Sequence, residues 1–352
     1  MSCLRISTVA KPSSMTCIPS TSYFATPEYL KLSSHGATAI SIPIHLFGLY
    51  CVLCKTPEQM KSVKWYFVNL HIWIVLYDYS VCILTIPMLL LPSMSGYTLG
   101  VLTDWGVPNI LQTVAVFLFL IYVLLSILAI FENRFYAVCN FDWKASWGKF
   151  RCFWLGLHYF VGFVILIPFV LLAPEQTEAK KLILQRLPCL PDYIKNANLF
   201  TTATDYTYHI TVLTTFLVFG VSEAVIFIMM LIFNTISQLR AKRMSRKLFD
   251  IQKKFFLALV IQMFVPMFFL LIPLSYAIFS ILSNYYNQAI TNIGVTLEST
   301  HGLVSSLVMI FIHRPYREAF FDMFSRGVVV KNELNLSAQN NRIAPFRISN
   351  KF

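Results

Sequence analysis

Residues 114–131 read VAVFLFLIYVLLSILAIF, a run of 18 residues without one charged side chain. A bilayer core about 30 Å thick needs roughly 20 apolar residues in helical conformation, which this run and its flanks supply. Lipid offers the backbone no hydrogen-bonding partners, so a spanning segment must be a helix or part of a closed barrel. The run lacks the alternation of a barrel strand. We therefore expect a transmembrane helix over 107–131.

Six further runs have similar length and few charges, and each is bounded by charged residues or by sequence rich in Pro, Asn or Gly. The composition also favours a membrane location: 57% of the 352 residues are hydrophobic, only 12% are charged, and the mean hydropathy is +0.65. A soluble domain carries about 25% charged residues. The fold class we expect is an all-α membrane protein, a seven-transmembrane helix bundle with spans at 33–54, 65–91, 107–131, 152–173, 210–233, 255–282 and 291–312.

The basic residues orient this bundle. The net charge is +12, but the 28 Lys and Arg residues fall between apolar runs, so they indicate membrane orientation and nucleic acid is not an expected partner. Segments 92–106 and 283–290 contain no Lys or Arg, whereas the alternate segments contain Lys55, Lys61, Lys64, Arg134, Lys144, Lys149, Arg151, Arg240, Lys242, Arg243, Arg246, Lys247, Lys253 and Lys254. By the positive-inside rule, 1–32 is extracellular and 313–352 is a cytoplasmic tail, with a short membrane-surface helix near 318–324.

Nine short stretches then follow one another in a family order. They are Pro43–Pro57, Lys64–Asp78, GYTLG at 96–100, FENR at 131–134, LPCLP at 187–191, Gln252–Gln262, NYYN at 284–287, His301-Gly302 and HRPYR at 313–317. Together they resemble the nematode serpentine chemoreceptors of class H and cover 23–324. The sequence departs from that family at Leu248, where a Thr is usual, and at Glu298, where the family is mostly apolar.

The resemblance implies a chemosensory G-protein-coupled receptor. Such a receptor binds a small-molecule cue in the outer half of the bundle and activates a heterotrimeric G protein at the inner face. It is a multi-pass protein of the plasma membrane, in sensory neurons. A membrane transporter or ligand-gated channel is the alternative, although no internal repeat of the kind several transporters show stands out. No two histidines lie within five residues of each other, as paired metal ligands on one helix would, so we expect no enzyme, metal or cofactor.

Four residues, Asp78, His71, Pro266 and Pro273, are candidates for a conformational switch. Asp78 lies seven residues from both His71 and Thr85, which places the three on one helix face. Asp78 resembles the polar second-helix position of rhodopsin-like receptors, where switching is organised. The alternatives are a carboxyl that only packs helices together and a direct ligand contact. Pro266 and Pro273 lie seven apart in the sixth span and predict a kink that would let this helix swing.

Two other intramembrane carboxylates are candidates for ligand binding. Glu298, His301 and Ser305 form a polar stripe in the outer half of the seventh span, where a small ligand could be held. An interhelical hydrogen-bonding seam is the alternative reading of this stripe. Glu223 lies in the middle of the fifth span, and because a charge in lipid is costly, we expect it to face the bundle interior. A ligand contact and an interhelical hydrogen bond explain it equally well.

The coupling candidates lie at the inner face. Glu132-Asn133-Arg134 ends the third span and resembles the acidic-X-Arg triplet of rhodopsin-like receptors. An Arg held by a neighbouring carboxylate can be released to reach carbonyls of a partner when the inner mouth opens; simple positive-inside anchoring is the alternative. The remaining candidates could contact a Gα subunit or anionic lipid: Arg240, Lys242, Arg243, Arg246, Lys247, His313, Pro315, Tyr316 and Arg317.

Three of the eight cysteines, Cys3, Cys17 and Cys189, fall on the predicted outer side. The usual receptor disulfide joins the start of the third span to the second outer loop, but 103–113 contains no Cys. We expect a Cys17–Cys189 bridge in its place, with Cys3 as the alternative partner of Cys189.

Overall fold

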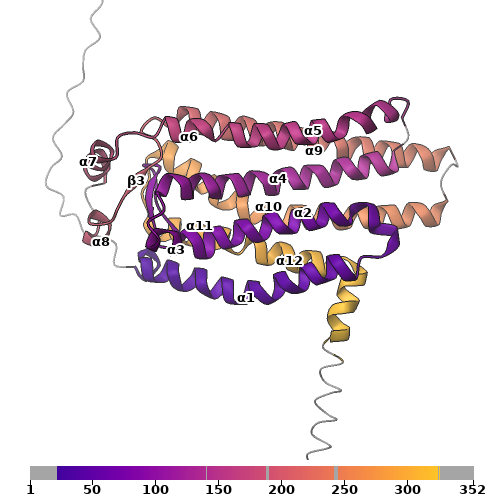
Figure 1. Cartoon of the computed structure of the whole chain (residues 1–352), viewed down its shortest axis with the longest axis horizontal. Helices are drawn as coiled ribbons and strands as arrows, with labels where there is room; N and C mark the ends of the chain where they lie inside the picture. The colour runs from indigo at the N-terminus through magenta and orange to yellow at the C-terminus, as the bar shows by residue number, and fades with distance from the viewer. Residues whose placement is uncertain (1–21, 140, 188–189, 242–244, 324, 326–352) are drawn as a thin grey trace, which may run out of the picture.

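A computed structural model of the chain describes residues 22–323 and 325, except 140, 188–189 and 242–244. Seven helices within this part are long and apolar enough to cross a membrane, and they lie side by side along the long axis of the molecule (Figure 1). They run over Pro27–Cys54, Lys61–Thr85, Asn109–Val138, Lys144–Leu171, Thr207–Arg240, Arg246–Ser283 and Gln288–Ile312. The predicted seven-helix membrane bundle is confirmed.

The spans are built from named elements. Spans one to three are α1 (Pro27–Cys54), α2 (Lys61–Tyr79) with the π turn η3 (Ser80–Thr85), and α4 (Asn109–Val138). Spans four to seven are α5 (Lys144–Val164) with α6 (Ile167–Leu171), α9 (Thr207–Arg240), α10 (Arg246–Ser283), and α11 (Gln288–Ser299) with α12 (His301–Ile312). The connections contain η1 (Tyr23–Ala25), η2 (Glu58–Met60), α3 (Val101–Asp104), α7 (Gln176–Arg186) and α8 (Asp192–Lys195).

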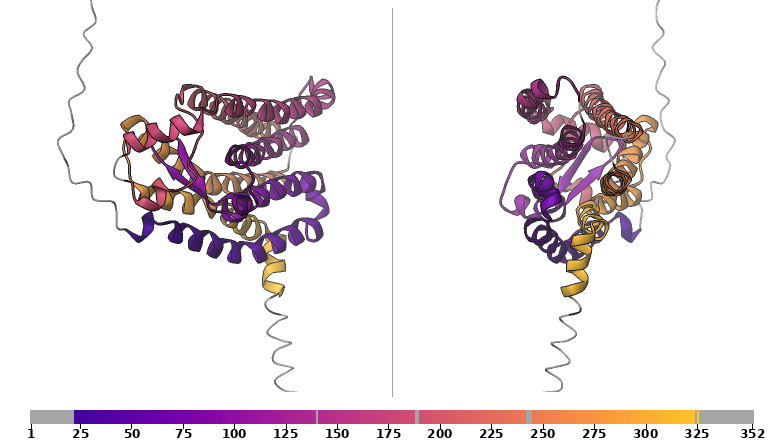
Figure 2. Two further views of the ribbon diagram at one scale, coloured as in Figure 1. Left: turned by 60° about the vertical axis from the view of Figure 1, so that its left-hand side comes forward. Right: turned by 90° about the vertical axis from the view of Figure 1, so that its right-hand side faces the viewer.

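Three short strands cross one end of the bundle. β1 (Pro87–Leu90), β2 (Ser95–Thr98) and β3 (Phe200–Thr201) form an antiparallel sheet in the order β1-β2-β3, with Leu90 opposite Ser95 and Ser95 opposite Thr201. We call this end, which also carries α7 and α8, the sheet end (Figure 2). The opposite end, from which the helix at 314–323 projects, is the tail end (Figure 1).

The predicted second span, 65–91, extended too far, because its last residues form strand β1 instead of helix. The helical part ends at Thr85, and Ile86 has a left-handed φ of 43°. A residue before proline disfavours helical geometry, and Pro87 has no N–H to donate. The carbonyl oxygen of Thr85 instead accepts the N–H groups of Leu99 and Gly100, both at 2.9 Å. The apolar residues that follow therefore pair with β2, and the bundle is helical except for this small sheet.

Two other spans contain breaks that the sequence reading did not include. In the fourth span, expected over 152–173, α5 ends at Val164 and α6 starts ahead of Pro168. In the seventh, expected over 291–312, Thr300 separates α11 from α12. The sixth span is one unbroken helix, α10, through the positions of both Pro266 and Pro273.

Side chains cap the start of several helices, as their sequence favours. Thr26 accepts the N–H of Tyr29 at 3.2 Å at the start of α1, and Ser245 accepts the N–H of Leu248 at 3.2 Å at the start of α10. α4 lies at the centre of the packing. One apolar cluster joins it to α1, α2, α10 and α12, and a second joins it to α5, α6 and α9. A third cluster fills the space under the sheet.

Candidate functional site

A buried polar cluster joins the first, second and seventh spans. Nε2 of His45 on α1 lies 3.0 Å from Oδ2 of Asp78 on α2, and its Nδ1 lies 2.9 Å from the hydroxyl of Ser306 on α12. The Nε2 of His71 donates to the carbonyl oxygen of His45 at 2.9 Å. His45 and Asp78 are each only 2% exposed. The cluster therefore ties three helices together through groups that lipid could not solvate.

Gly302 lets α12 approach this cluster. A Cβ atom at this position would lie 2.7 Å from Cγ of Asp78, closer than real Cβ contacts. The structure thus gives the His301-Gly302 pair a physical reason: a glycine is needed where the seventh span presses onto the carboxylate of the second. Asp78 and His71 are both buried on α2. Thr85 instead bonds within its own π turn, to the Ser80 carbonyl at 2.8 Å.

His45 and Ser306 are the members of the cluster that sequence reasoning missed. The signal for His45 was available, because a histidine inside an apolar span is itself an expensive group that calls for a partner. Its partner Asp78 lies 33 residues away, and only the packing of α1 on α2 brings them together.

Glu298 and His301 both contact Tyr77 of the second span. The Tyr77 hydroxyl donates a hydrogen bond to the Glu298 carboxylate, and the ring of His301 meets the Tyr77 ring edge-on at 5.9 Å between centroids. The void lined by His71 and Ser305 nearby has no space for a water-sized sphere. In this closed arrangement Glu298 and His301 join helices α11 and α12 to α2.

Glu223 makes a contact of the same kind between α9 and α5. Its Oε2 lies 2.9 Å from Nε2 of His158, whose Nδ1 lies 2.9 Å from the carbonyl oxygen of Trp154 and can only donate to it. Since Nδ1 carries a hydrogen, the contact with Glu223 needs a further proton on Nε2 or on the carboxyl group. His158 is a second intramembrane histidine that the sequence reading did not single out.

The tail end holds a denser network around Glu132. Arg151 of α5 donates to the Glu132 carboxylate at 2.6 Å and to the side-chain oxygen of Asn133 at 3.1 Å. Trp147 donates to the other Glu132 oxygen at 2.8 Å. From the sequence we expected Glu132, or another acid nearby, as the closed-state partner of Arg134; the ion pair that the structure gives Glu132 is with Arg151. α5 packs against this part of α4 and presents Arg151 to the carboxylate, whereas Arg134 follows two residues later on the helix.

The end of the seventh span is fixed to its neighbours. His313 lies 3.0 Å from the side-chain oxygen of Gln262 on α10, and the Tyr316 hydroxyl lies 2.7 Å from that of Thr56. Pro315 lies in the first turn of the helix at 314–323, a position that suits a residue without an N–H. Arg317 donates to the Phe311 carbonyl at 3.1 Å. The chain therefore turns at His313 and continues as a short helix.

The remaining candidates lie beside the connection between the fifth and sixth spans or outside the described residues. Arg240 ends α9, and Arg246 and Lys247 begin α10, so these three flank the connection between the fifth and sixth spans. Lys242 and Arg243 lie outside the described residues, as do Cys3, Cys17 and Cys189, so the expected disulfide stays a prediction. In the described part of the chain, no three His, Cys, Asp or Glu side chains group as metal ligands would.

Comparison with known proteins agrees with this architecture. The family model described as serpentine type 7TM GPCR chemoreceptor Srh matches residues 25–326. Serpentine receptor class H-72 of Caenorhabditis elegans is 27% identical over 325 residues, which cover 90% of each chain. The matched family is a receptor family and not an enzyme family. This chain, a multi-pass membrane protein with seven apolar helices, therefore belongs to the class H serpentine chemoreceptors.

Proposed function

We propose that the chain is a chemosensory G-protein-coupled receptor of the plasma membrane of sensory neurons. It recognises a small-molecule cue from its outer side and activates a heterotrimeric G protein from its inner side. The observation that supports this most is the network at the tail end, where Glu132 is bonded to Arg151 and Trp147 of the next span. This network joins two spans beside Arg134 and so holds the inner face closed. An activating motion could break these contacts and replace them with contacts to Gα.

The orientation follows from the basic residues. The ends of α4 and α9, the first half of α5 and the start of α10 lie toward the tail end (Figure 1), and they carry Arg134, Arg240, Arg151 and Arg246, respectively. By the positive-inside rule, this distribution supports a cytosolic tail end. The N-terminus and the sheet end are then outside. The basic ends of α9 and α10 form the surface offered to Gα or to anionic lipid, and Lys242 and Arg243 lie between these ends in the sequence.

Activation would be transmitted through the polar contacts between spans. Asp78 and His71 belong to a cluster that links the first, second and seventh spans, and Glu298 is bonded to Tyr77 of the second span. A ligand in the outer half that competes for Glu298, His301 or Glu223 would break a contact between spans. Such a ligand shifts the equilibrium only by its differential affinity for the open state.

Nucleotide exchange on a purified Gα subunit tests the proposal directly. Receptor in lipid nanodiscs is challenged with a panel of volatile and water-soluble odorants, and exchange should accelerate for at least one of them. Empty nanodiscs are the control for direct effects on Gα. If the same panel instead drives solute flux through receptor-containing proteoliposomes and leaves exchange unchanged, the chain acts as a transporter or channel and the proposal fails.

A further inference from the structure

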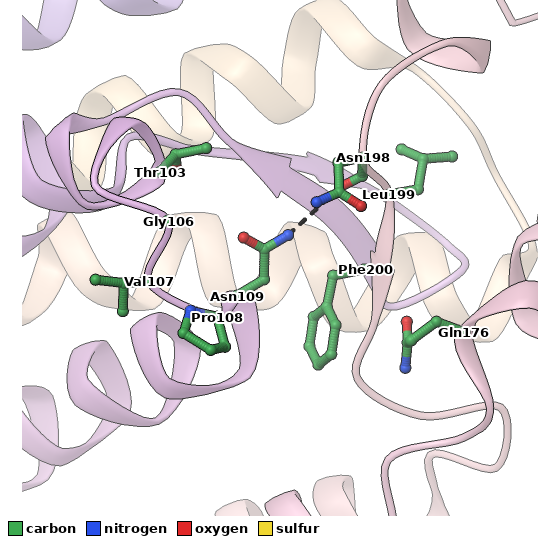
Figure 3. A pocket seen from close by; sticks show the side chains of 9 residues that line it. All are labelled: Thr103, Gly106, Val107, Pro108, Asn109, Gln176, Asn198, Leu199 and Phe200. Atoms are coloured by element: carbon green, nitrogen blue, oxygen red, sulfur yellow. Dashed lines mark hydrogen bonds between the residues drawn. The ribbon is translucent and has the colours of Figure 1, made fainter.

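A pocket of about 240 Å³ opens at the sheet end, where the start of α4 meets β3 and α7 (Figure 3). Its walls include Thr103, Val107, Asn109, Gln176, Asn198 and Phe200. The volume equals that of about eight water molecules at roughly 30 Å³ each, so it suits a molecule of about eight non-hydrogen atoms. The pocket is separate from Glu298, His301 and Glu223, none of which lines it.

The walls carry no ionisable side chain. Their polar groups are the hydroxyl of Thr103 and the carboxamides of Asn109, Gln176 and Asn198, and the rest is apolar. The Gln176 amide is occupied, since it bonds to the backbone of Pro174 and Thr201. A carboxylate or ammonium ligand would find no opposite charge here, whereas an uncharged molecule with one polar group would find both a hydrogen-bond donor and an apolar wall.

Asn109 is the residue best placed to meet such a group. Its Oδ1 accepts a hydrogen bond from Thr98 at 3.1 Å, which fixes the orientation of the amide. Its Nδ2 donates to the carbonyl oxygen of Asn198 at 3.4 Å, beyond the 2.7–3.2 Å range of well-formed N–H···O bonds. A ligand oxygen can replace such a long bond at little cost, and Nδ2 has a second hydrogen to offer.

This contact also stands where many receptors have a covalent link. Residues 103–113 contain no cysteine, so the start of α4 is not bridged to the second outer loop by a disulfide in this stretch. The Asn109–Asn198 hydrogen bond makes that connection here. α4 is one helix from Asn109 to Val138, and it carries Glu132 and Arg134 near its other end. One continuous helix therefore joins the pocket to the coupling candidates at the tail end.

We propose that this pocket is a recognition site, additional to Glu298, His301 and Glu223, for a small uncharged molecule with one hydrogen-bond-accepting group and a short apolar chain, such as an alcohol, ketone or amide. The group accepts from Nδ2 of Asn109 in place of Asn198, and the chain packs on Val107 and Phe200. Only the effect of this site on signalling rests on the proposed receptor function, because ligand binding itself needs no G protein.

The test is ligand-observed saturation-transfer NMR on the purified full-length receptor in lipid nanodiscs, with empty nanodiscs subtracted. The probes are hexan-1-ol, hexan-2-one and hexanamide, with hexanoate and hexylammonium as charged molecules of the same size. The uncharged probes should bind and the charged ones should not. Val107→Trp fills the pocket and should weaken binding about tenfold or more. Trp105→Ala is the matched control, because Trp105 is 73% exposed in the same loop and does not line the pocket.

Asn109→Asp gives a second variant that does not depend on filling the space. It keeps an acceptor for Thr98 and removes the Nδ2 donor, so binding of hexan-2-one, which can only accept a hydrogen bond, should fall while the fold is retained. Equal binding of charged and uncharged probes, absence of binding by all three uncharged probes, or binding unchanged in both variants would each overturn the site. If binding behaves as expected but no probe or odorant stimulates exchange on Gα, the receptor function fails and the site stands.

Discussion

Glu132 of α4 and Arg151 of α5 form a buried salt bridge with 2.6 Å between Oε2 and Nη2. The Arg151 guanidinium also lies 4.3 Å from the ring centre of Tyr136, one turn further along α4. The two side chains are only 3% and 14% exposed, so neither charge could be left alone without a large desolvation cost. The pair therefore fixes the fourth span against the third at the end where G-protein coupling is proposed.

Removing either partner of this pair should destabilise the receptor. Glu132→Gln and Arg151→Gln should each cost about 3–5 kcal/mol, because each leaves one buried charge without its counter-ion. The double variant should cost less than the sum of the two, which a double-mutant cycle on thermal unfolding of the purified receptor measures. Lys149→Gln is the control, since Lys149 is exposed on the same helix. Additive effects would show that the two side chains do not interact.

Arg134→Ala should abolish or strongly reduce nucleotide exchange on Gα at unchanged surface density. Its guanidinium has five donors that can meet carbonyls of a Gα terminus once the inner mouth opens. Glu132→Gln and Arg151→Gln should act in the opposite direction and raise basal exchange, because both remove the same contact of the closed state. If this contact stabilises the closed state over the open state by about 1–2 kcal/mol, its loss would change the ratio of open to closed receptor roughly five- to thirtyfold. Normal signalling by Arg134→Ala would contradict the coupling role and leave positive-inside anchoring as the role of Glu132-Asn133-Arg134.

The sequence alone was sufficient for the bundle because membrane spans are local features. A run such as 114–131 predicts a helix without reference to any other part of the chain. The strand Pro87–Leu90 was hidden for the same reason, since four apolar residues at the end of a span look like more span. What ends the helix is the pairing with 95–98, which a pattern read along one segment does not contain.

The partners of the polar residues were harder to predict than the residues themselves. Asp78, Glu223 and Glu298 stand out because a carboxylate in an apolar run is costly. Their partners His45, His158 and Tyr77 lie on other spans, at separations of 33, 65 and 221 residues. For Glu132, closeness in sequence favoured Arg134, but the packing of α5 on α4 brought Arg151 to the carboxylate instead.

Acidification should loosen the start of α7. The backbone N–H groups of Glu178 and Thr177 bond to the Glu175 carboxylate and hold its pKa below the usual value. A lowered pKa means that this cap is complete at neutral pH and is lost as the pH falls below the ordinary glutamate range. Amide hydrogen exchange of 176–179 should therefore be slower in wild type than in Glu175→Ala at pH 7, and the difference should vanish in acid. A difference that does not change with pH would contradict the cap.

The orientation can be checked with a protease confined to the outside of intact cells. Lys181 and Arg186 of α7 are exposed at the sheet end, and trypsin should cut there. Arg246 and Lys247 at the start of α10 are exposed at the tail end and should be cut only after the membrane is made permeable. The expected pattern follows from the distribution of Lys and Arg. If trypsin cuts the receptor on intact cells at 246–247 and leaves 174–209 uncut, the orientation is the reverse of the one proposed.

Gly302→Ala should separate the seventh span from the second. The added Cβ would lie 2.7 Å from Cγ and 2.9 Å from Cβ of Asp78, atoms at the root of a short side chain that cannot swing away. α12 must therefore shift, which costs about 1–3 kcal/mol and stretches the His45–Asp78 and His45–Ser306 contacts. Gly156→Ala, where nothing lies within 4 Å of the new Cβ, is the matched control and should unfold at the wild-type temperature or slightly above it. Both variants are compared with wild type by thermal unfolding of purified receptor, and equal midpoints for the two would show that α12 does not press on Asp78.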